Sequence, residues 1–446
     1  MNTVEGDRFP VGTVAAWLQL WCGPVLMSTE LPVVYQCQVV QQQETPASCV
    51  VRDIPRVDTS TLPIPSIESG TEASSLKSLT ARTRLPLGLA SRRPSPAKMK
   101  LAVYSAKPYD KQYLTTAQSA AADGSAVTLV FHDFPLTPET VQTAAGADAV
   151  CCFVNDTLNA AVLEALGAAD VGAVLLRCAG FNNVDLATAE RLGLFVANVP
   201  SYSPEAVAEF AVALLQTLNR KTHRAFNRVR EGNFDLDGLL GRTLHGKTVG
   251  VVGTGRIGIC FARIMSGFGC RLLAYDPFPN DAFKQYGDFA GLDELLAASD
   301  IVSLHCPLMD ATRHVINAES LAKMKKGALL LNTSRGGLVD TRAAIAALKS
   351  KHLGGLALDV YEGEGALFYA DHSGDIIEDD ELMRLMTFPN VIMCGHQAFF
   401  TEEALTEISD GTLRNLDDFI KGVSCKNALV KTGNTLQRKD SIPIRI

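Results

Sequence analysis

The sequence predicts an α/β protein with two doubly wound parallel sheets, each in a domain of its own. The length of 446 residues is too great for one typical core and indicates two folded units with additional segments. Short apolar runs alternate with helical periodicity in two successive series, as strands do in parallel sheets that are buried on both faces. A glycine-rich turn directly follows the first apolar run of the second series and opens a helical pattern.

The composition favours a folded chain and excludes several classes of site. Hydrophobic residues make up 47% and charged residues 20% of the sequence, so most of the chain can bury a core. The net charge of −7, from 41 basic and 48 acidic side chains, argues against a nucleic-acid-binding surface. The 11 cysteines form no CxxC pair, so the sequence indicates neither a metal site nor a disulfide framework.

Residues 1–98 are predicted to be a disordered leader. They are rich in Ser, Thr and Pro, and between Val33 and Lys98 they show no convincing periodic run. The segment Thr71–Lys98 carries many basic residues and the single acid Glu72, which is typical of a transit peptide for a chloroplast or mitochondrion. The alternative is a cytoplasmic protein whose functional chain starts at Met99.

The uncharged stretch 9–29 resembles a membrane anchor in length and polarity. It is interrupted by Gly12, Gln19, Gly23 and Pro24, and the residues before it include the acids Glu5 and Asp7. These features argue against a membrane-spanning helix. We therefore expect no membrane association.

The first series of strands is predicted in a domain of residues 99–201. Its apolar runs lie at 101–105, 127–131, 149–154 and 172–176, with helical patterns between them. Ser203, Pro204 and Glu205 then provide an N-cap, a proline at the first helical position and an acid in the first turn. Apolar spacing through residue 229 predicts one continuous helix of about seven turns, which would bridge the domains and contact another subunit.

The second series is predicted in a domain of residues 202–397. Its strands are expected at 247–252, 271–276, 301–306, 328–333, 355–360 and 391–396. Residues 398–430 are expected to return to the first domain, and residues 431–446 form a C-terminal tail. Helices in the gaps would make the second sheet doubly wound.

The turn GTGRIG, residues 253–258, predicts a dinucleotide site. Gly253 permits a tight turn, Gly255 lets the backbone approach a pyrophosphate, and Gly258 lets the helix pack against the strand. Asp276 ends the next strand, where it can accept hydrogen bonds from ribose hydroxyls. Because an acid there would repel a 2′-phosphate, the expected cofactor is NAD and not NADP.

Polar residues follow several later strands of the second series. Arg335, Asp359, Glu364 and His396 come from distant parts of the chain, but the carboxyl ends of parallel strands meet at one edge of a sheet. Arg335 offers a permanent charge and a bidentate fork for a carboxylate. His396 can act as a general acid or base, and Glu364 can favour its protonated form. Taken singly, each could be a surface or core residue, but together they favour hydride transfer to a 2-keto acid.

From Met99 to about Leu429 the chain resembles the D-2-hydroxyacid dehydrogenase family, and within it the fermentative D-lactate dehydrogenase branch. The matching phrases are KLAVYSAKPYD (100–110), LRCAGFNNVDL (176–186), SPEAVAE (203–209), GTGRIG (253–258), LHCPL (304–308), NTSRGGLVD (332–340), LDVYEGE (358–364) and GHQAF (395–399). The leader and the tail lie outside this resemblance.

The resemblance implies a role for each of several residues. Arg335 would bind the substrate, His396 would be the acid/base, Glu364 its partner, and Glu362 a bystander. The turn Ala179–Gly180 would hold the substrate carboxylate, with Tyr202, Phe399 and Phe153 as hinge and pocket-wall residues. Cofactor contacts would come from the turn, including Arg256 and Ile257, and from Asp276, Cys306, Pro307, Thr333 and Asp359. His305 would either contact the cofactor or satisfy a backbone carbonyl.

The function implied is NAD-dependent interconversion of pyruvate and D-lactate by a homodimer or homotetramer. Two alternatives stay open. One is a dehydrogenase for another D-2-hydroxy acid, of the glycerate or glyoxylate type or derived from a branched 2-keto acid, which a larger pocket near Phe153 and Phe399 would favour. The other is an NADH-sensing binding protein that resembles a corepressor.

Overall fold

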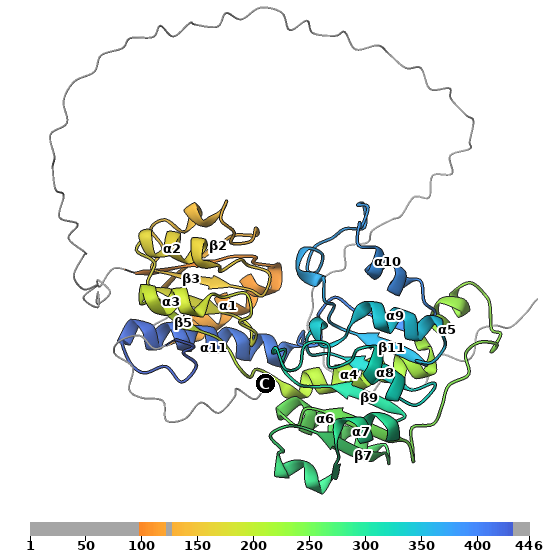
Figure 1. Cartoon of the computed structure of the whole chain (residues 1–446). Helices are drawn as coiled ribbons and strands as arrows, with labels where there is room; N and C mark the ends of the chain where they lie inside the picture. Colours follow the sequence, from red (N-terminus) through yellow and green to blue (C-terminus); the bar gives the residue numbers. More distant parts are fainter. Residues whose placement is uncertain (1–97, 122–126, 431–446) are drawn as a thin grey trace, which may run out of the picture. The chain divides into compact units, whose positions relative to one another are not determined.

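The computed structural model describes residues 98–121 and 127–430 (Figure 1). Apart from Lys98, the predicted leader lies outside the described residues, as do the stretch 9–29 and the tail 431–446. The transit-peptide hypothesis therefore stays a prediction. Among the described residues, no helix is both long enough and apolar enough to cross a membrane.

The first domain is built on a parallel sheet of five strands in the order β2-β1-β3-β4-β5. The strands are β1 (Met99–Val103), β2 (Val127–Phe131), β3 (Ala149–Cys152), β4 (Ala173–Leu176) and β5 (Phe195–Ala197). The helices are α1 (Pro108–Ala120), α2 (Ala160–Ala168), α3 (Leu186–Leu192) and the 3-10 helix η2 (Val141–Ala144). Four of these strands were predicted, although two predicted runs extend past their ends at Val103 and Cys152. The three-residue strand β5 was not predicted.

Both faces of this sheet are buried, which explains its uniform apolar strands. In β1, Leu101 and Val103 pack in a cluster with Leu114 of α1 and Leu416 of α11 (Glu402–Lys421). Ala102 packs on the other face, in a cluster formed by α2 and α3. Because successive side chains of a strand alternate between faces, a strand covered on both sides must be apolar throughout.

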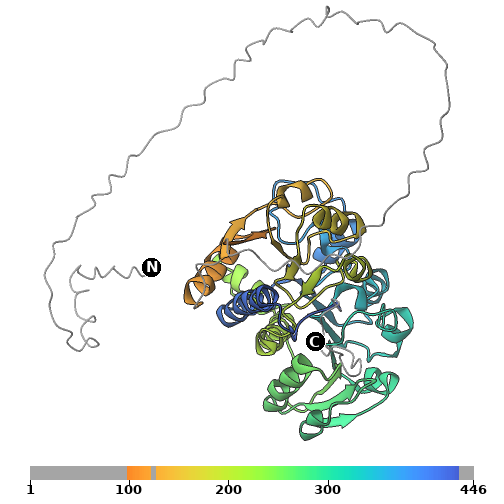
Figure 2. The ribbon, with the colours of Figure 1, turned by 90° about the vertical axis from the view of Figure 1, so that its left-hand side faces the viewer.

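The C-terminal segment returns to the first domain, as expected. Helix α11 lies beside α1, and Figure 2 shows the blue helix next to the orange one. After α11, the N–H of Leu429 donates to the carbonyl oxygen of Val196 in β5, at 2.8 Å. The described chain thus crosses into the second domain and comes back.

The second domain holds a parallel sheet of seven strands in the order β12-β11-β10-β9-β6-β7-β8. The strands are β6 (Thr248–Val252), β7 (Arg271–Tyr275), β8 (Gly287–Phe289), β9 (Ile301–Leu304), β10 (Leu329–Asn332), β11 (Gly355–Leu358) and β12 (Val391–Met393). Six were predicted, and β8, with three residues, was not. The strand order reverses between β6 and β9, which is where α/β sheets of this kind bind ligands.

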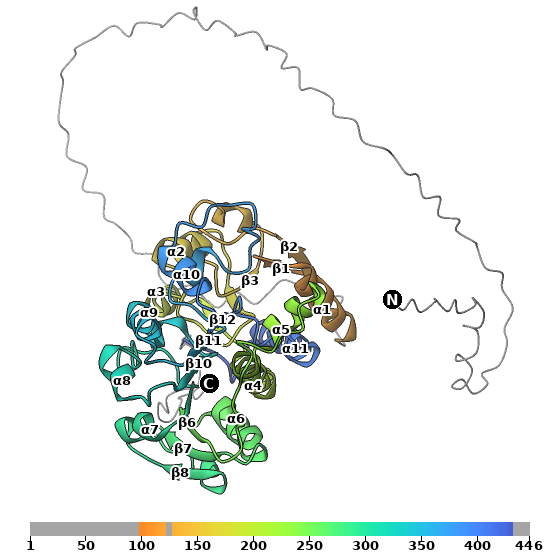
Figure 3. The same ribbon diagram turned by 90° about the vertical axis from the view of Figure 1, so that its right-hand side faces the viewer.

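Helices cover both faces of the second sheet, which confirms the doubly wound α/β class. They are α4 (Pro204–Arg220), α5 (Thr222–Arg230), α6 (Arg256–Gly267), α7 (Leu292–Ala298), α8 (Ala318–Lys323), α9 (Thr341–Lys349) and α10 (Asp380–Met386), with 3-10 helices η3 (Asp281–Gln285), η4 (Gly336–Leu338) and η5 (Glu364–Ala366). Figure 3 shows α7, α8 and α9 on one face and α4 and α6 on the other. Each group packs with the sheet into its own apolar cluster.

The prediction of one continuous helix after Ser203 was wrong. The Oγ of Ser203 does accept from the N–H of Ala206, as an N-cap. The helix ends at Arg220, however, because Lys221 has φ +52°, and α5 starts at Thr222. The ammonium of Lys221 donates to the carbonyl oxygen of Leu240 at 2.5 Å, a contact with the following loop that holds this break.

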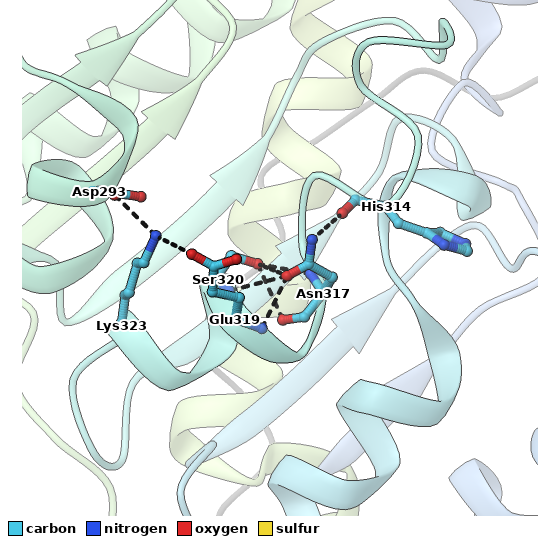
Figure 4. Close-up of polar contacts among 6 residues, drawn as sticks. All are labelled: Asp293, His314, Asn317, Glu319, Ser320 and Lys323. Atoms are coloured by element: carbon cyan, nitrogen blue, oxygen red, sulfur yellow. Dashed lines mark hydrogen bonds and ion pairs between the residues drawn. The ribbon is translucent and has the colours of Figure 1, made fainter.

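Helix α8 shows how a short helix in this domain is fixed (Figure 4). The side-chain oxygen of Asn317 accepts from the N–H groups of Glu319 and Ser320, which caps the N-terminus. Lys323 then joins Glu319 of its own helix to Asp293 of α7, at 2.9 Å in each case. These polar contacts hold the outer helices and are unrelated to the candidate site.

Candidate active site

The glycine-rich turn connects β6 to α6 through closely packed backbone. Gly253 has φ +99°, and a Cβ there would lie 2.7 Å from the carbonyl carbon and oxygen of His305. A Cβ on Gly258 would lie 2.1 Å from the carbonyl oxygen of Gly253. Gly255 is the N-cap of the helix, followed by the exposed Arg256 and the half-buried Ile257. The turn leads directly into a helix N-terminus, where free N–H groups and the helix dipole favour an anion such as a pyrophosphate.

Asp276 lies beside this turn in the folded protein. Its Oδ2 accepts from the N–H and the hydroxyl of Thr254, at 2.7 and 2.8 Å, and its Oδ1 accepts from the N–H of Phe278 at 2.8 Å. These bonds fix the carboxylate while leaving lone pairs for further donors. Thr254, between two of the glycines, was not singled out from the sequence. Its side chain is the link between the turn and the acid.

Cys306, Pro307 and Thr333 lie at the carboxyl ends of β9 and β10, next to each other in the sheet. The carbonyl oxygen of Cys306 accepts from the hydroxyl of Ser334 at 2.6 Å, and that of Pro307 accepts from Thr312 at 2.6 Å. Burial raises the pKa of the Cys306 thiol to about 12, so the thiol stays neutral. The hydroxyl of Thr333 is buried and has no hydrogen-bond partner among the described residues. An unpaired buried hydroxyl, the glycine turn and the fixed Asp276 together fit a bound dinucleotide.

The side chain of His305 packs in the core, and the cofactor contact considered from the sequence stays a prediction. It is buried, its Nε2 lies 2.9 Å from the hydroxyl of Ser303, and its ring packs on Phe261 with 4.8 Å between centroids. Burial lowers its pKa to about 3, so it stays neutral. His305 is a core residue, and its backbone packs closely against Gly253.

His396 and Glu364 form a direct pair. The Nδ1 of His396 lies 2.9 Å from Oε1 of Glu364, and the two side chains are 17% and 22% exposed. The other carboxylate oxygen of Glu364 accepts from the N–H of Tyr361 at 2.8 Å. Glu362 points elsewhere, to His314 at 2.8 Å and Arg313 at 3.3 Å. The pair leaves Nε2 of the imidazole free to exchange a proton with a ligand.

Asp359 shapes the turn that presents His396. Its carboxylate is fully buried and accepts from the N–H groups of Gln397 and Ala398, at 2.9 and 2.8 Å. Its carbonyl oxygen accepts from the N–H of His396 at 2.7 Å, and His396 has the left-handed φ of +55°. Burial raises the pKa of Asp359 to about 6, although the two backbone N–H groups and His396 oppose this shift. Asp359 therefore holds the backbone of the turn on which His396 lies.

Arg335 lies against the Ala179–Gly180 turn of the first domain. Its Nη1 donates to the carbonyl oxygen of Ser334 at 2.7 Å, and its carbonyl oxygen accepts from Asn332 at 2.8 Å. A Cβ on Gly180 would lie 2.6 Å from Nη2 of Arg335, so a side chain at this position would displace the guanidinium. The carbonyl oxygen of Ala179 accepts from Asn198 at 2.7 Å, which fixes the turn. A guanidinium beside a glycine turn is a suitable place for a carboxylate.

Four aromatic residues form what we call the aromatic cluster: Phe153, Tyr202, Tyr369 and Phe399. Ring centroids of Phe153 and Tyr202 each lie 6.2 Å from that of Phe399, and Phe153 lies 4.9 Å from Tyr369. The Tyr369 ring lies 5.9 Å from the imidazole of His396. The structure therefore brings the three aromatic residues chosen from the sequence together, and Tyr369 contacts both this group and the acid/base candidate.

Two residues of this region were not found from the sequence. Tyr369 had no recognisable signal because it lies in an irregular segment between η5 and α10. Arg177 is fully buried, pairs with Asp110 at 3.0 Å, and stacks 4.9 Å from the ring centroid of Phe153. An arginine at the end of an apolar strand could have indicated a buried ion pair. The spacing of residues does not indicate which acid is its partner.

Within the described residues, no group of three or more His, Cys, Asp or Glu side chains could hold a metal ion. The arrangement instead offers an acid/base imidazole, a carboxylate that orients it, a guanidinium for an anion and a dinucleotide turn. Groups of these types, so arranged, can support hydride transfer to a small oxo acid.

Comparison with known proteins gives consistent matches. Residues 212–398 match the family model described as "D-isomer specific 2-hydroxyacid dehydrogenase, NAD binding domain". A "2-hydroxyacid dehydrogenase A" of Aspergillus oryzae is 67% identical over 348 residues, which cover 78% of this chain and 100% of the relative. A D-lactate dehydrogenase of Curvularia clavata is 66% identical over 342 residues, 77% of this chain and 98% of the relative. The apo structure of D-lactate dehydrogenase from Escherichia coli, 49% identical, has a TM-score of 0.68 and covers 74% of this chain and 100% of its own.

Proposed function

The chain belongs to the D-isomer specific 2-hydroxyacid dehydrogenase family, an oxidoreductase family with NAD as cofactor, and within it we propose a D-lactate dehydrogenase that interconverts pyruvate and D-lactate. The observation that carries this proposal is the pairing of His396 with Glu364 on strand-end segments of the NAD-binding domain, with Arg335 on the same edge of the sheet. Similar proteins that bear the name D-lactate dehydrogenase support the choice of substrate.

Arg335 binds the carboxylate of pyruvate. Its guanidinium carries a permanent charge, and its Nη2 already lies beside Gly180, whose backbone borders the anion. Two parallel N–H groups of a guanidinium fix a carboxylate in one orientation, which aligns the adjacent C2 carbonyl. Positive charge next to that carbonyl also stabilises the alkoxide that develops during reduction.

His396 gives a proton from Nε2 to the C2 oxygen during reduction and takes it back during oxidation of D-lactate. Glu364 on Nδ1 fixes the tautomer and the orientation of the imidazole. Asp359 keeps the residue in place through the turn at Gln397 and Ala398. Bound NADH supplies the hydride that C2 accepts.

The residues that would hold the cofactor are the turn Gly253–Gly258 for the pyrophosphate and Asp276 for the ribose. Cys306 and Pro307 would border the adenosine, and the unpaired hydroxyl of Thr333 would face the nicotinamide end with Asp359. Asp276 is fixed by Thr254, so it cannot turn away from a 2′-phosphate. The resulting repulsion favours NAD over NADP.

We also propose that the enzyme assembles as a homodimer or homotetramer. Helix α5 has no buried residue, and the loop after it exposes Phe234, Leu236 and Leu240, the last at 89%. Apolar side chains this exposed and this close in sequence are typical of a surface that another subunit covers. Light scattering tests this by measuring the molar mass of the wild type and of the double variant Leu236→Ser/Leu240→Ser. Val423→Ser, which changes another exposed residue, is the control. A monomeric wild type would refute it.

The test of the substrate is a comparison of kcat/KM for NADH oxidation with pyruvate, glyoxylate, hydroxypyruvate and 2-ketoisocaproate. The proposal requires the highest value for pyruvate. A higher value for one of the other acids reassigns the substrate within the family. NADH binding without turnover on any of the four acids would favour the alternative of an NADH-sensing protein.

A further inference from the structure

Both backbone polar groups of His396 are held in a conformation that is rare for a residue with a side chain. The φ of His396 is +55°, which a non-glycine residue keeps only when its surroundings enforce it. Its N–H donates to the carbonyl oxygen of Asp359 at 2.7 Å. Its carbonyl oxygen accepts from the hydroxyl of Tyr369 at 3.2 Å. Tyr369 thus supplies the second of the two backbone contacts that fix His396.

Tyr369 reaches this position from an irregular segment of the NAD-binding domain. It has φ +69° itself, so its own backbone is also held away from the common regions. Its ring meets Phe153 of the first domain edge to face, with 4.9 Å between centroids. The same ring is tilted at 37° to the imidazole of His396, with 5.9 Å between the centroids. Tyr369 therefore contacts both an aromatic residue of the substrate domain and the acid/base residue.

The hydroxyl of Tyr369 is a protonated donor near neutral pH. Burial raises its pKa above the ordinary value, and the carboxylates of Glu364 and Asp359 nearby raise it further. A phenol that stays protonated near neutral pH can donate its hydrogen bond to the His396 carbonyl oxygen there. It does not compete with the imidazole for the transferred proton.

We propose that Tyr369 positions His396 through its hydroxyl and, through its ring packed on Phe153, limits the substrate to 2-oxo acids with a short side chain. The inference rests on the proposed function, because it concerns the same acid/base residue and the same substrate. A 2-oxo acid whose C2 oxygen meets His396 and whose carboxylate meets Arg335 has one remaining substituent. We expect that substituent to face the Phe153–Tyr369 pair, which should accept a methyl group more readily than a branched chain.

Two variants distinguish the role of the Tyr369 hydroxyl from the role of its ring. Tyr369→Phe removes the hydroxyl and keeps the ring, whereas Tyr369→Ala removes both. Tyr286→Phe, which loses a hydroxyl in another part of the NAD-binding domain, is the matched control. For each full-length protein, kcat and KM are measured with pyruvate and 2-ketoisocaproate. Dissociation constants are measured, with NADH present, for oxamate and N-isopropyl oxamate, which are unreactive analogues of the short and the branched acid.

Tyr369→Phe is expected to lower kcat for pyruvate by about 2- to 10-fold, the loss of one hydrogen bond, with KM and the preference for the short acid unchanged. Tyr369→Ala is expected to shift both the kcat/KM ratio and the analogue ratio toward the branched compound by about 10-fold or more. Tyr286→Phe is expected to behave as wild type. A residue that only supported the fold would lower activity on both acids equally and leave both ratios unchanged.

Unchanged ratios in Tyr369→Ala overturn the limit on substrate size, and an unchanged kcat in Tyr369→Phe overturns the positioning of His396. Failure of the proposed function looks different. A wild type that binds oxamate without turning over pyruvate refutes the function, while the analogue ratio still decides the role of the ring. A wild type that binds neither analogue refutes both.

Discussion

Nδ1 of His396 lies 2.9 Å from Oε1 of Glu364, although the two residues follow different strands of the sheet. If Glu364 acts through His396, the effects of changing the two residues are not additive. His396→Ala should lower kcat for pyruvate by ~10²- to 10⁴-fold while NADH binding stays nearly unchanged. Glu364→Gln should lower kcat in the wild-type background and have little further effect in the His396→Ala background. Steady-state kinetics of the four proteins measure this, and fully additive losses would separate Glu364 from His396.

Arg335→Lys should raise the KM for pyruvate by about 10- to 100-fold, because a single ammonium cannot replace two parallel hydrogen bonds to a carboxylate. NADH binding should not change. Arg414→Lys, an exposed residue of α11 paired with Glu407, is the control for the loss of a guanidinium. A KM within twofold of wild type in Arg335→Lys would remove Arg335 from the substrate site.

Gly253→Ala should abolish NADH binding, because its Cβ would overlap the backbone of His305 and Cys306. Gly246→Ala is a matched control: Gly246 has φ +74°, but a Cβ there meets nothing within 4 Å. Both substitutions bear the cost of a side chain at positive φ, about 1 kcal/mol or more, and only the first also displaces the turn. Fluorescence titration with NADH distinguishes them. Equal affinities in the two variants would show that close packing at Gly253 is unimportant for the cofactor.

The raised pKa of Asp359 predicts that the stability of the protein depends on pH. Its pKa is raised from 3.8 to about 6 in the folded protein, so the folded state binds the proton more tightly than the unfolded state. The free energy of unfolding should therefore decrease by roughly 2 kcal/mol, from this group alone, as the pH rises from about 4 to about 6. Asp359→Asn lacks this titration, so wild type should lose stability relative to the variant over that range. Urea unfolding of both proteins at the two ends of the range tests the sign. A difference that is constant with pH contradicts the raised pKa.

Much of the fold could be predicted because its signals are local. Strands buried on both faces have uniform apolar runs, and the turn at residues 253–258 has glycines where the backbone needs them. Strands β5 and β8 were missed because three residues are too few to show a pattern. The break at Lys221 was missed because the apolar spacing continues through it, and a lysine gives no signal for a left-handed conformation.

The candidate site was predicted less completely because its geometry depends on long-range contacts. Residues at strand ends could be chosen by type, since parallel strands bring their carboxyl ends together. Other contacts depend on how irregular segments pack. Examples are the approach of Gly180 to Arg335 and the contacts of Tyr369 with Phe153 and His396. Thr254 and Arg177 were missed for the same reason, because each acts on a partner that is distant in sequence.

The most direct measurement of the central claim is the loss of NADH absorbance on adding pyruvate to the full-length protein, followed by chiral analysis of the lactate formed. The account predicts rapid oxidation of NADH and a product that is D-lactate alone. A product that is L-lactate, or NADH that binds without being oxidised, would contradict it.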